Sequence, residues 1–144
     1  MRVALVIERF EPRGGVERVA WQVAHGLAAA GDEVHVVARK AAASEAVRLH
    51  LVRGASKWQP WRVVAFSRAA AHAAPRGDFD VVHAWHTRDH VLARRALGTA
   101  PRRTALVRSW RSAERIPPWP WHRWLFGSAC DGLLCVSPAT AQAN

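Results

Sequence analysis

The chain has 144 residues, half of them hydrophobic, which is enough for one domain with a real core and excludes a disordered chain. No apolar run is long enough to span a membrane, so any contact with a membrane would be peripheral. Two cysteines, Cys130 and Cys135, are too few for a disulfide framework or a zinc site. We therefore expect a reduced, cytoplasmic protein.

The formal net charge of +10 comes from 21 Lys and Arg residues against 11 Asp and Glu residues. One interpretation is a compositional bias, because Ala and Arg are both abundant. The other is a functional positive field that attracts nucleotide phosphates, anionic lipid or nucleic acid.

The first third of the chain predicts a strand, a loop, a helix and a second strand. Residues 2–8 form a continuous apolar run, which is typical of a strand that is buried on both faces. Hydrophobic residues then recur every three or four positions over 16–30, which predicts a helix that Gly31 ends. Residues 33–38 are a second apolar run. Together they indicate a right-handed βαβ unit.

The rest of the chain continues this alternation. Further strands are predicted at 47–52, 79–85, 104–110 and 132–137, with helices at 60–74 and 88–97 and another that begins at Pro138. The pattern indicates an α/β fold, a Rossmann-like parallel sheet flanked by helices, in a single domain over residues 1–144.

Two adjacent glycines, Gly14 and Gly15, separate the first strand from the first helix. In open α/β sheets, ligands bind at the carboxyl ends of strands, where helix N-termini attract anions. Glycine lets the backbone approach a phosphate because it has no Cβ. The pair could equally make a tight turn with positive φ, since neither G-x-G-x-x-G nor a P-loop lysine is present. The residues alone leave both interpretations open.

Three histidines lie at or just after the carboxyl end of the fourth predicted strand, in the stretch "FDVVHAWHTRDH". His83 and His86 could bind an acceptor hydroxyl or a phosphate at the carboxyl edge of the sheet. Their spacing matches no trusted zinc signature, so no metal is expected. We expect His90, inside the next helix, to be a hydrogen-bonded structural residue.

Tryptophan and arginine gather in residues 108–126, with a smaller cluster in 57–62. Tryptophan prefers the membrane interface, and arginine attracts anionic headgroups. Stacking rings and cations would also suit nucleic acid, but no nucleic-acid module fits this order of elements, so we expect no nucleic-acid partner. Core packing is the alternative, and we expect it for Trp21. A surface facing a membrane or a partner is expected for Trp58, Trp61, Trp119, Trp121, Arg123 and Trp124.

Three blocks of the chain resemble the N-terminal domain of family 4 glycosyltransferases, which are retaining enzymes of the GT-B fold. The opening block "GGVERVAWQVAHGLAAAGDEV" supplies Gly14, Gly15, Glu17 and Arg18 at the family's positions. "FDVVHAW" and "CDGLLCVSPATAQ" are similar to two later strands of the family. The blocks lie in the family's order and span nearly the whole chain.

The resemblance implies a role for several residues. Gly14 and Gly15 would place backbone N–H groups against the diphosphate of the donor. Arg18, His83 and His86 would lie on the acceptor side of the cleft. The implied reaction transfers a sugar from a nucleotide-sugar to a hydroxyl of a lipid- or glycan-linked acceptor, with no metal and no cofactor, because helix N-termini and cations neutralise the leaving diphosphate.

Two departures from the family's pattern matter. Many members carry a histidine after the fifth strand, where this chain has Ser109 and Trp110. The C-terminal donor-binding domain, with its paired-glutamate motif, is missing from the 144 residues. We therefore expect a half that needs a donor-binding domain, in cis or in trans, and does not turn over alone.

Two other classes of protein are alternatives to the transferase. A non-catalytic, membrane-associated binding module that recruits a partner enzyme stays open. An NAD-dependent enzyme is disfavoured, because Arg39 and Lys40 stand where an acidic residue would bind the ribose. For the transferase we expect a cytoplasmic position, peripheral to the inner membrane face, that anionic lipid would favour.

Overall fold

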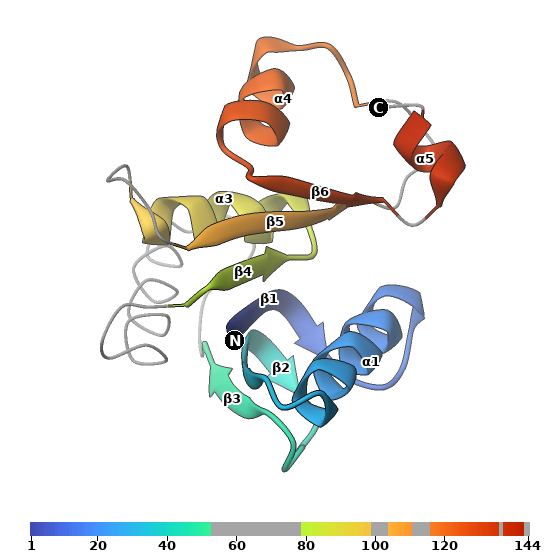
Figure 1. Ribbon diagram of the computed structural model, residues 1–144, viewed down its shortest axis with the longest axis vertical. Coiled ribbons are helices and arrows are strands. Elements are labelled where there is room, and N and C mark those ends of the chain that lie inside the picture. The colour runs from blue at the N-terminus through green and yellow to red at the C-terminus, as the bar shows by residue number, and fades with distance from the viewer. Residues whose placement is uncertain (53–78, 99–103, 111–115, 136, 143–144) are drawn as a thin grey trace.

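The computed structural model describes residues 1–52, 79–98, 104–110, 116–135 and 137–142. Six parallel strands form one sheet in the order β3-β2-β1-β4-β5-β6 (Figure 1). The strands are β1 (Arg2–Phe10), β2 (Glu33–Ala41), β3 (Arg48–Leu51), β4 (Val81–Ala84), β5 (Ala105–Trp110) and β6 (Gly132–Cys135). The α/β sheet predicted from the sequence is confirmed.

Helices connect the strands and close the described part of the chain. They are α1 (Gly15–Ala29), α3 (Thr87–Leu97), the short α4 (Pro120–Arg123) with the π-helical turn η1 (Trp124–Ser128), and α5 (Pro138–Gln142). Figure 1 shows α1 beside β1 and β2, and α4 beyond the β6 end of the sheet. The helix predicted over 60–74 lies outside the described residues. None of the helices that the structure describes is long and apolar enough to cross a membrane.

The central strand β1 is buried on both faces. Its odd-numbered residues from Val3 to Ile7 pack with α1, while Ala4 and Val6 pack with α3 on the opposite face. This two-sided burial explains why the sequence shows a continuous apolar run instead of alternation. The pairing with β2 continues to Phe10, so β1 extends two residues beyond the predicted end at residue 8.

The helix α1 ends in a Schellman motif. The N–H of Gly31 donates to the carbonyl of Ala28, and the N–H of Asp32 donates to the carbonyl of Leu27. Gly31 has φ of +91°, the left-handed conformation that glycine adopts without strain. The stop predicted at Gly31 is therefore confirmed. Trp21, expected in the core, is partly buried and stacks on Phe10 with ring centroids 4.7 Å apart.

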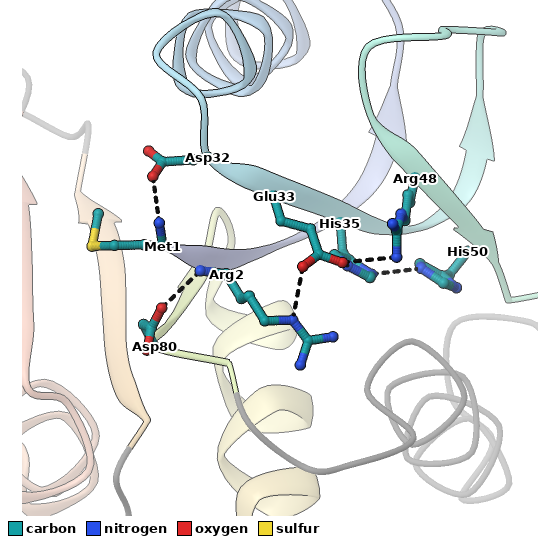
Figure 2. Close-up of polar contacts among 8 residues, drawn as sticks. All are labelled: Met1, Arg2, Asp32, Glu33, His35, Arg48, His50 and Asp80. Carbon is teal, nitrogen blue, oxygen red and sulfur yellow. Dashed lines mark hydrogen bonds and ion pairs between the residues drawn. The ribbon is translucent and has the colours of Figure 1, made fainter.

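Polar contacts tie the amino ends of the central strands together (Figure 2). The terminal ammonium of Met1 lies 2.7 Å from Asp32 Oδ1. The backbone N–H of Arg2 donates to Asp80 Oδ2 at 2.7 Å, and its side-chain Nε donates to Glu33 Oε2 at 3.1 Å. These bonds join the first residues of β1 to the starts of β2 and β4, so they fix the ends of three neighbouring strands.

Glu33 also anchors a chain of two histidines at this edge. Its Oε1 lies 3.0 Å from Nε2 of the buried His35 and 2.7 Å from Arg48 Nη1. Because a carboxylate only accepts, His35 donates through Nε2, and its Nδ1 meets Nε2 of His50 at 3.0 Å. The hydrogen bond from His35 is the leading cause that lowers the pKa of Glu33, and burial lowers the pKa of His50. These pKa directions keep Glu33 charged and His50 neutral.

Candidate functional site

The turn between β1 and α1 requires glycine at one of its two glycine positions. Gly14 has φ of +84° and ψ of 169°, a conformation that side-chain-bearing residues rarely adopt. A Cβ on Gly15 would meet no atom within 4 Å, so local packing does not demand glycine there. The turn therefore explains Gly14, while the open space around Gly15 leaves room for a ligand to approach the backbone.

The N-terminus of α1 opens at the carboxyl edge of the sheet without a side-chain cap. Gly14 is the N-cap residue, and no side chain makes a capping hydrogen bond there. The carboxylate of Glu17 folds back over Gly14, so that a Cβ on Gly14 would lie 2.6 Å from Glu17 Oε2. An acidic group at this position matches the positive end of the helix dipole. Arg18 follows it and is exposed.

His83 lies on the face of the sheet that α1 partly covers. Its Nε2 is 2.8 Å from Ser109 Oγ of the neighbouring strand, and its ring stacks on Trp85. Only 6% of His83 is exposed. It lines, with Ser109 and mainly apolar residues, a cavity of about 390 Å³. Ser109 is thus a hydrogen-bond partner of His83.

His86 caps the N-terminus of α3. Its backbone N–H donates to Asp89 Oδ2 at 3.2 Å, and its side chain accepts the backbone N–H of Asp89, which completes a capping box. His90 is fully buried, and its Nε2–H donates to the carbonyl of Ala129 at 3.1 Å. His90 therefore has the structural role expected of it. The histidine series does not form one cluster, because β4 and α3 direct its members to different places.

The residues that sequence reasoning missed form a charged group where β1 and β2 end and α3 begins. Glu8 accepts from two arginines: its Oε1 lies 3.0 Å from Arg39 Nη2, and its Oε2 lies 2.6 Å from Arg88 Nη2. The sequence signal for this group was the presence of charged residues near the carboxyl ends of two apolar strands. The adjacency of Glu8 and Arg39 follows from the β1–β2 register, which aligns Ile7 with Ala38.

Asp89, beside this group, is 3% exposed. Burial raises its pKa to about 7, although the charge of Arg88 and the hydrogen bond from the His86 backbone both act to lower it. Arg108 is also buried, and its Nη2 donates to Thr87 Oγ1 at 2.9 Å. The first turn of α3 is thus held by contacts to β1 and β5.

Three tryptophans in and next to α4 are exposed. Trp119 is 67% exposed, Trp121 50% and Trp124 42%, and Arg123 between them is exposed as well. The rings of Trp121 and Trp124 lie 5.1 Å apart. We call Trp119, Trp121, Arg123 and Trp124 the tryptophan patch. Trp58 and Trp61 lie outside the described residues, and no metal-binding group of three His, Cys, Asp or Glu occurs in the described ranges.

The model of Glycosyltransferase Family 4 matches residues 13–143, nearly the whole chain, including the glycine turn. The chain belongs to this family. None of the curated proteins compared with it matches it in sequence.

Solved structures share the fold at low sequence identity. Sucrose-phosphate synthase from Thermosynechococcus elongatus aligns with a TM-score of 0.69 and 14% identity, over 95% of this chain and 42% of its own. The lipopolysaccharide outer core galactosyltransferase WaaB, in its apo form, gives 0.67 and 14%, over 99% and 41%. WaaG, a glycosyltransferase involved in lipopolysaccharide biosynthesis, gives 0.54 and 15%, over 94% and 45%. The chain spans less than half the length of each.

Replacing Gly14 tests whether the turn before α1 requires glycine. Gly14→Ala should lower the free energy of unfolding by roughly 1–3 kcal/mol, because alanine is strained at this φ and ψ. The control Gly26→Ala, within α1 and with no atom near its Cβ position, should raise stability by about 0.5–1 kcal/mol. Denaturant titrations measure both. Equal stability of Gly14→Ala and the unchanged chain would contradict the requirement for glycine.

Replacing Asp89 should change how stability depends on pH. Its folded pKa of about 7 lies above the ordinary 3.8, so the folded chain holds a proton that the unfolded chain has lost. This group therefore lowers stability as pH rises from about 4 to about 7, by up to about 4 kcal/mol. Asp89→Asn should flatten that slope and be the more stable protein at pH 8, since its amide oxygen can still accept from His86. The exposed Glu45→Gln is the control, and an unchanged slope in Asp89→Asn would refute the assignment.

Proposed function

We propose that this chain is the acceptor-binding half of a retaining glycosyltransferase. With a donor-binding domain it would transfer a sugar from a nucleotide-sugar to a hydroxyl of a lipid- or glycan-linked acceptor. The observation that carries the proposal is the uncapped α1 N-terminus behind Gly14 and Gly15, at the carboxyl edge of the sheet, in a family 4 chain. Helix N-termini there favour the negative charge that develops on a leaving diphosphate.

The acceptor would lie beside this turn. Arg18 is exposed and His86 is partly exposed, so both offer accessible polar groups near helix N-termini. His83 is held by Ser109 and would meet an acceptor only from the 390 Å³ cavity. Within the proposal, the backbone of Gly14 and Gly15 contacts the donor phosphates. Arg18 and His86 contact the acceptor, and His83 contacts it from the sheet interior. No metal or other cofactor is required by this scheme.

A second half would supply the nucleotide-sugar. Each of the solved relatives named above is more than twice as long as the part that this chain covers. We propose that a donor-binding domain joins this domain, either in the same polypeptide or as a separate partner. WaaB acts as a lipopolysaccharide outer core galactosyltransferase, and this likeness supports a lipopolysaccharide-type glycan as the acceptor.

The tryptophan patch suits a peripheral position on an anionic membrane. Its three indoles are exposed together, and Arg123 adds positive charge to a chain of net charge +10. Indoles favour the interface between water and lipid, and each cation near an anionic surface contributes about 1 kcal/mol. A cytoplasmic domain on the inner membrane face would thus meet a lipid-linked acceptor where that lipid lies.

A non-catalytic, membrane-associated module that recruits a partner enzyme is the alternative. The observation that favours it is the presence of Ser109 and Trp110 where many relatives have a histidine. Ser109 is engaged with His83, and the ring of Trp110 packs on Phe126 at 5.1 Å. The transfer experiment decides between the two functions.

Sugar transfer should require both halves. The 144-residue chain alone should give no transfer from labelled nucleotide-sugars, and the chain joined to its donor-binding domain should give product. In the joined protein, Gly15→Asp should reduce transfer at least about tenfold at unchanged melting temperature, because a carboxylate would repel the diphosphate. Gly26→Ala is the matched control. Turnover by the chain alone, or full activity of Gly15→Asp, would contradict the proposal.

Membrane binding should depend on the tryptophan patch. In sedimentation with vesicles, the chain should bind those that contain anionic lipid and bind neutral ones weakly. Trp119→Ala combined with Trp121→Ala should abolish most of the bound fraction, and Arg123→Gln should weaken it. Arg95→Gln, an exposed cation of α3, should leave binding near its original level. Equal binding to neutral and anionic vesicles, or binding to neither, would contradict the proposed contact with an anionic membrane.

A further inference from the structure

A small cavity opens on the α3 side of the sheet, where β1 and β2 end. Its volume is about 50 Å³, and its polar rim consists of Glu8, Arg39, Arg88 and Asp89. A cavity of this size has room for at least one water molecule. The cavity is lined by the carboxyl-terminal parts of β1 and β2, by Val52 and by the first turns of α3. Open α/β sheets bind ligands outside the carboxyl ends of their strands.

The cavity rim carries more positive than negative charge. Arg39 and Arg88 each pair with one oxygen of Glu8, and Arg88 Nη2 also lies 3.9 Å from Asp89 Oδ1. Burial opposes the ionisation of Glu8, but the hydrogen bond and charge of Arg88, with the charge of Arg39, outweigh it and lower its pKa. Asp89 is ionised only part of the time near neutral pH, since burial raises its pKa to about 7. Two permanent cations therefore face one permanent anion.

The two guanidiniums keep capacity for another acceptor. Each guanidinium has five N–H donors, and Glu8 offers only two oxygens to the pair. Nε of Arg39 is buried and makes no hydrogen bond to the residues described. The side chains of Arg39 and Arg88 are about one third exposed, at 36% and 35%, so a ligand can reach them. Planar guanidiniums recognise carboxylates and phosphates better than they recognise neutral groups.

We propose that Arg39 and Arg88 form a binding site for a terminal oxyanion, a phosphate or carboxylate, on the acceptor. Glu8 is the internal counter-ion that holds the two guanidiniums in place while the site is empty, and the ligand competes with it. The acceptor assignment rests on the proposed transferase function. It adds a specificity to that function: the enzyme selects an acidic acceptor over a neutral one.

The position of the site separates it from the donor. The glycine turn leads into α1, which packs on one face of the sheet, while Arg88 belongs to α3 on the other face. The two anion-attracting features thus share the carboxyl edge but not the face. A nucleotide-sugar carries its diphosphate internally, between two bulky groups. A terminal phosphate on a glycan has no such group on its outer side and can approach the two rim arginines end-on.

The test is a titration of the ¹⁵N-labelled chain at pH 7 and constant ionic strength. Inorganic phosphate and glucose 6-phosphate should shift the amide resonances of Arg39 and Arg88, and UDP-glucose should leave them in place. Arg88→Gln and Arg39→Gln should each weaken phosphate binding about tenfold or more, as loss of a charge-assisted hydrogen bond predicts. Arg95→Gln, an exposed arginine at the far end of α3, should bind phosphate like the unchanged chain.

Glu8→Gln distinguishes a binding site from a structural clamp. The amide still accepts from an arginine but removes the competing charge, so phosphate should bind several-fold more tightly. If Glu8→Gln weakens phosphate binding as much as Arg88→Gln does, the group is a clamp and the proposal is wrong. Arg88→Lys, which keeps a point charge, should retain part of the binding. It replaces Arg88→Gln as the test if the glutamine variant does not fold.

The outcomes separate this proposal from the transferase proposal. If phosphate binds with the expected dependence on Arg39 and Arg88 but the joined protein transfers no sugar, the anion site stands and the transferase function fails. If transfer occurs and phosphate never perturbs these residues, the anion site fails alone. If UDP-glucose binds at Arg39 and Arg88 as tightly as glucose 6-phosphate, the site serves the donor, and the acceptor assignment is overturned.

Discussion

The two-sided burial of β1 is the constraint on which the rest of the structure depends. Its apolar side chains pack with α1 on one face and with α3 on the other, and its backbone pairs with β2 and β4. Because β1 and β4 are parallel and each is followed by a helix, α1 and α3 begin at the same edge of the sheet. The glycine turn, the capping box of α3 and the Glu8 group therefore lie at that edge.

At the opposite edge of the sheet, the charged groups pair with one another. At the amino ends of the strands, Glu33 accepts from Arg2, His35 and Arg48, and Met1 and Arg2 are tied to Asp32 and Asp80. Acidic and basic groups are matched there within the chain. At the carboxyl edge, α1 has no side-chain cap, and two arginines share one glutamate. The proposed anion sites at the carboxyl edge rest on this difference.

Family membership and fold explain part of this structure, and two of its features need a separate explanation. Membership of glycosyltransferase family 4 and the six-stranded sheet account for the glycine turn and for the order of elements. They do not account for the hydrogen bond between His83 and Ser109. The exposed tryptophan patch is likewise a property of this chain's surface, and the proposed membrane contact rests on it.

The sequence by itself determined the elements whose signals are local. The apolar runs at 2–8 and 33–38, the helical stripe, and the stop at Gly31 depend on burial and backbone conformation, and the structure confirms them. Only the tertiary structure decided which side chains meet. His83 turns to Ser109 because strands alternate their faces, and His86 caps a helix because it precedes α3. Glu8, Arg39 and Arg88 are far apart in the chain, and only strand register and helix packing bring their charges together.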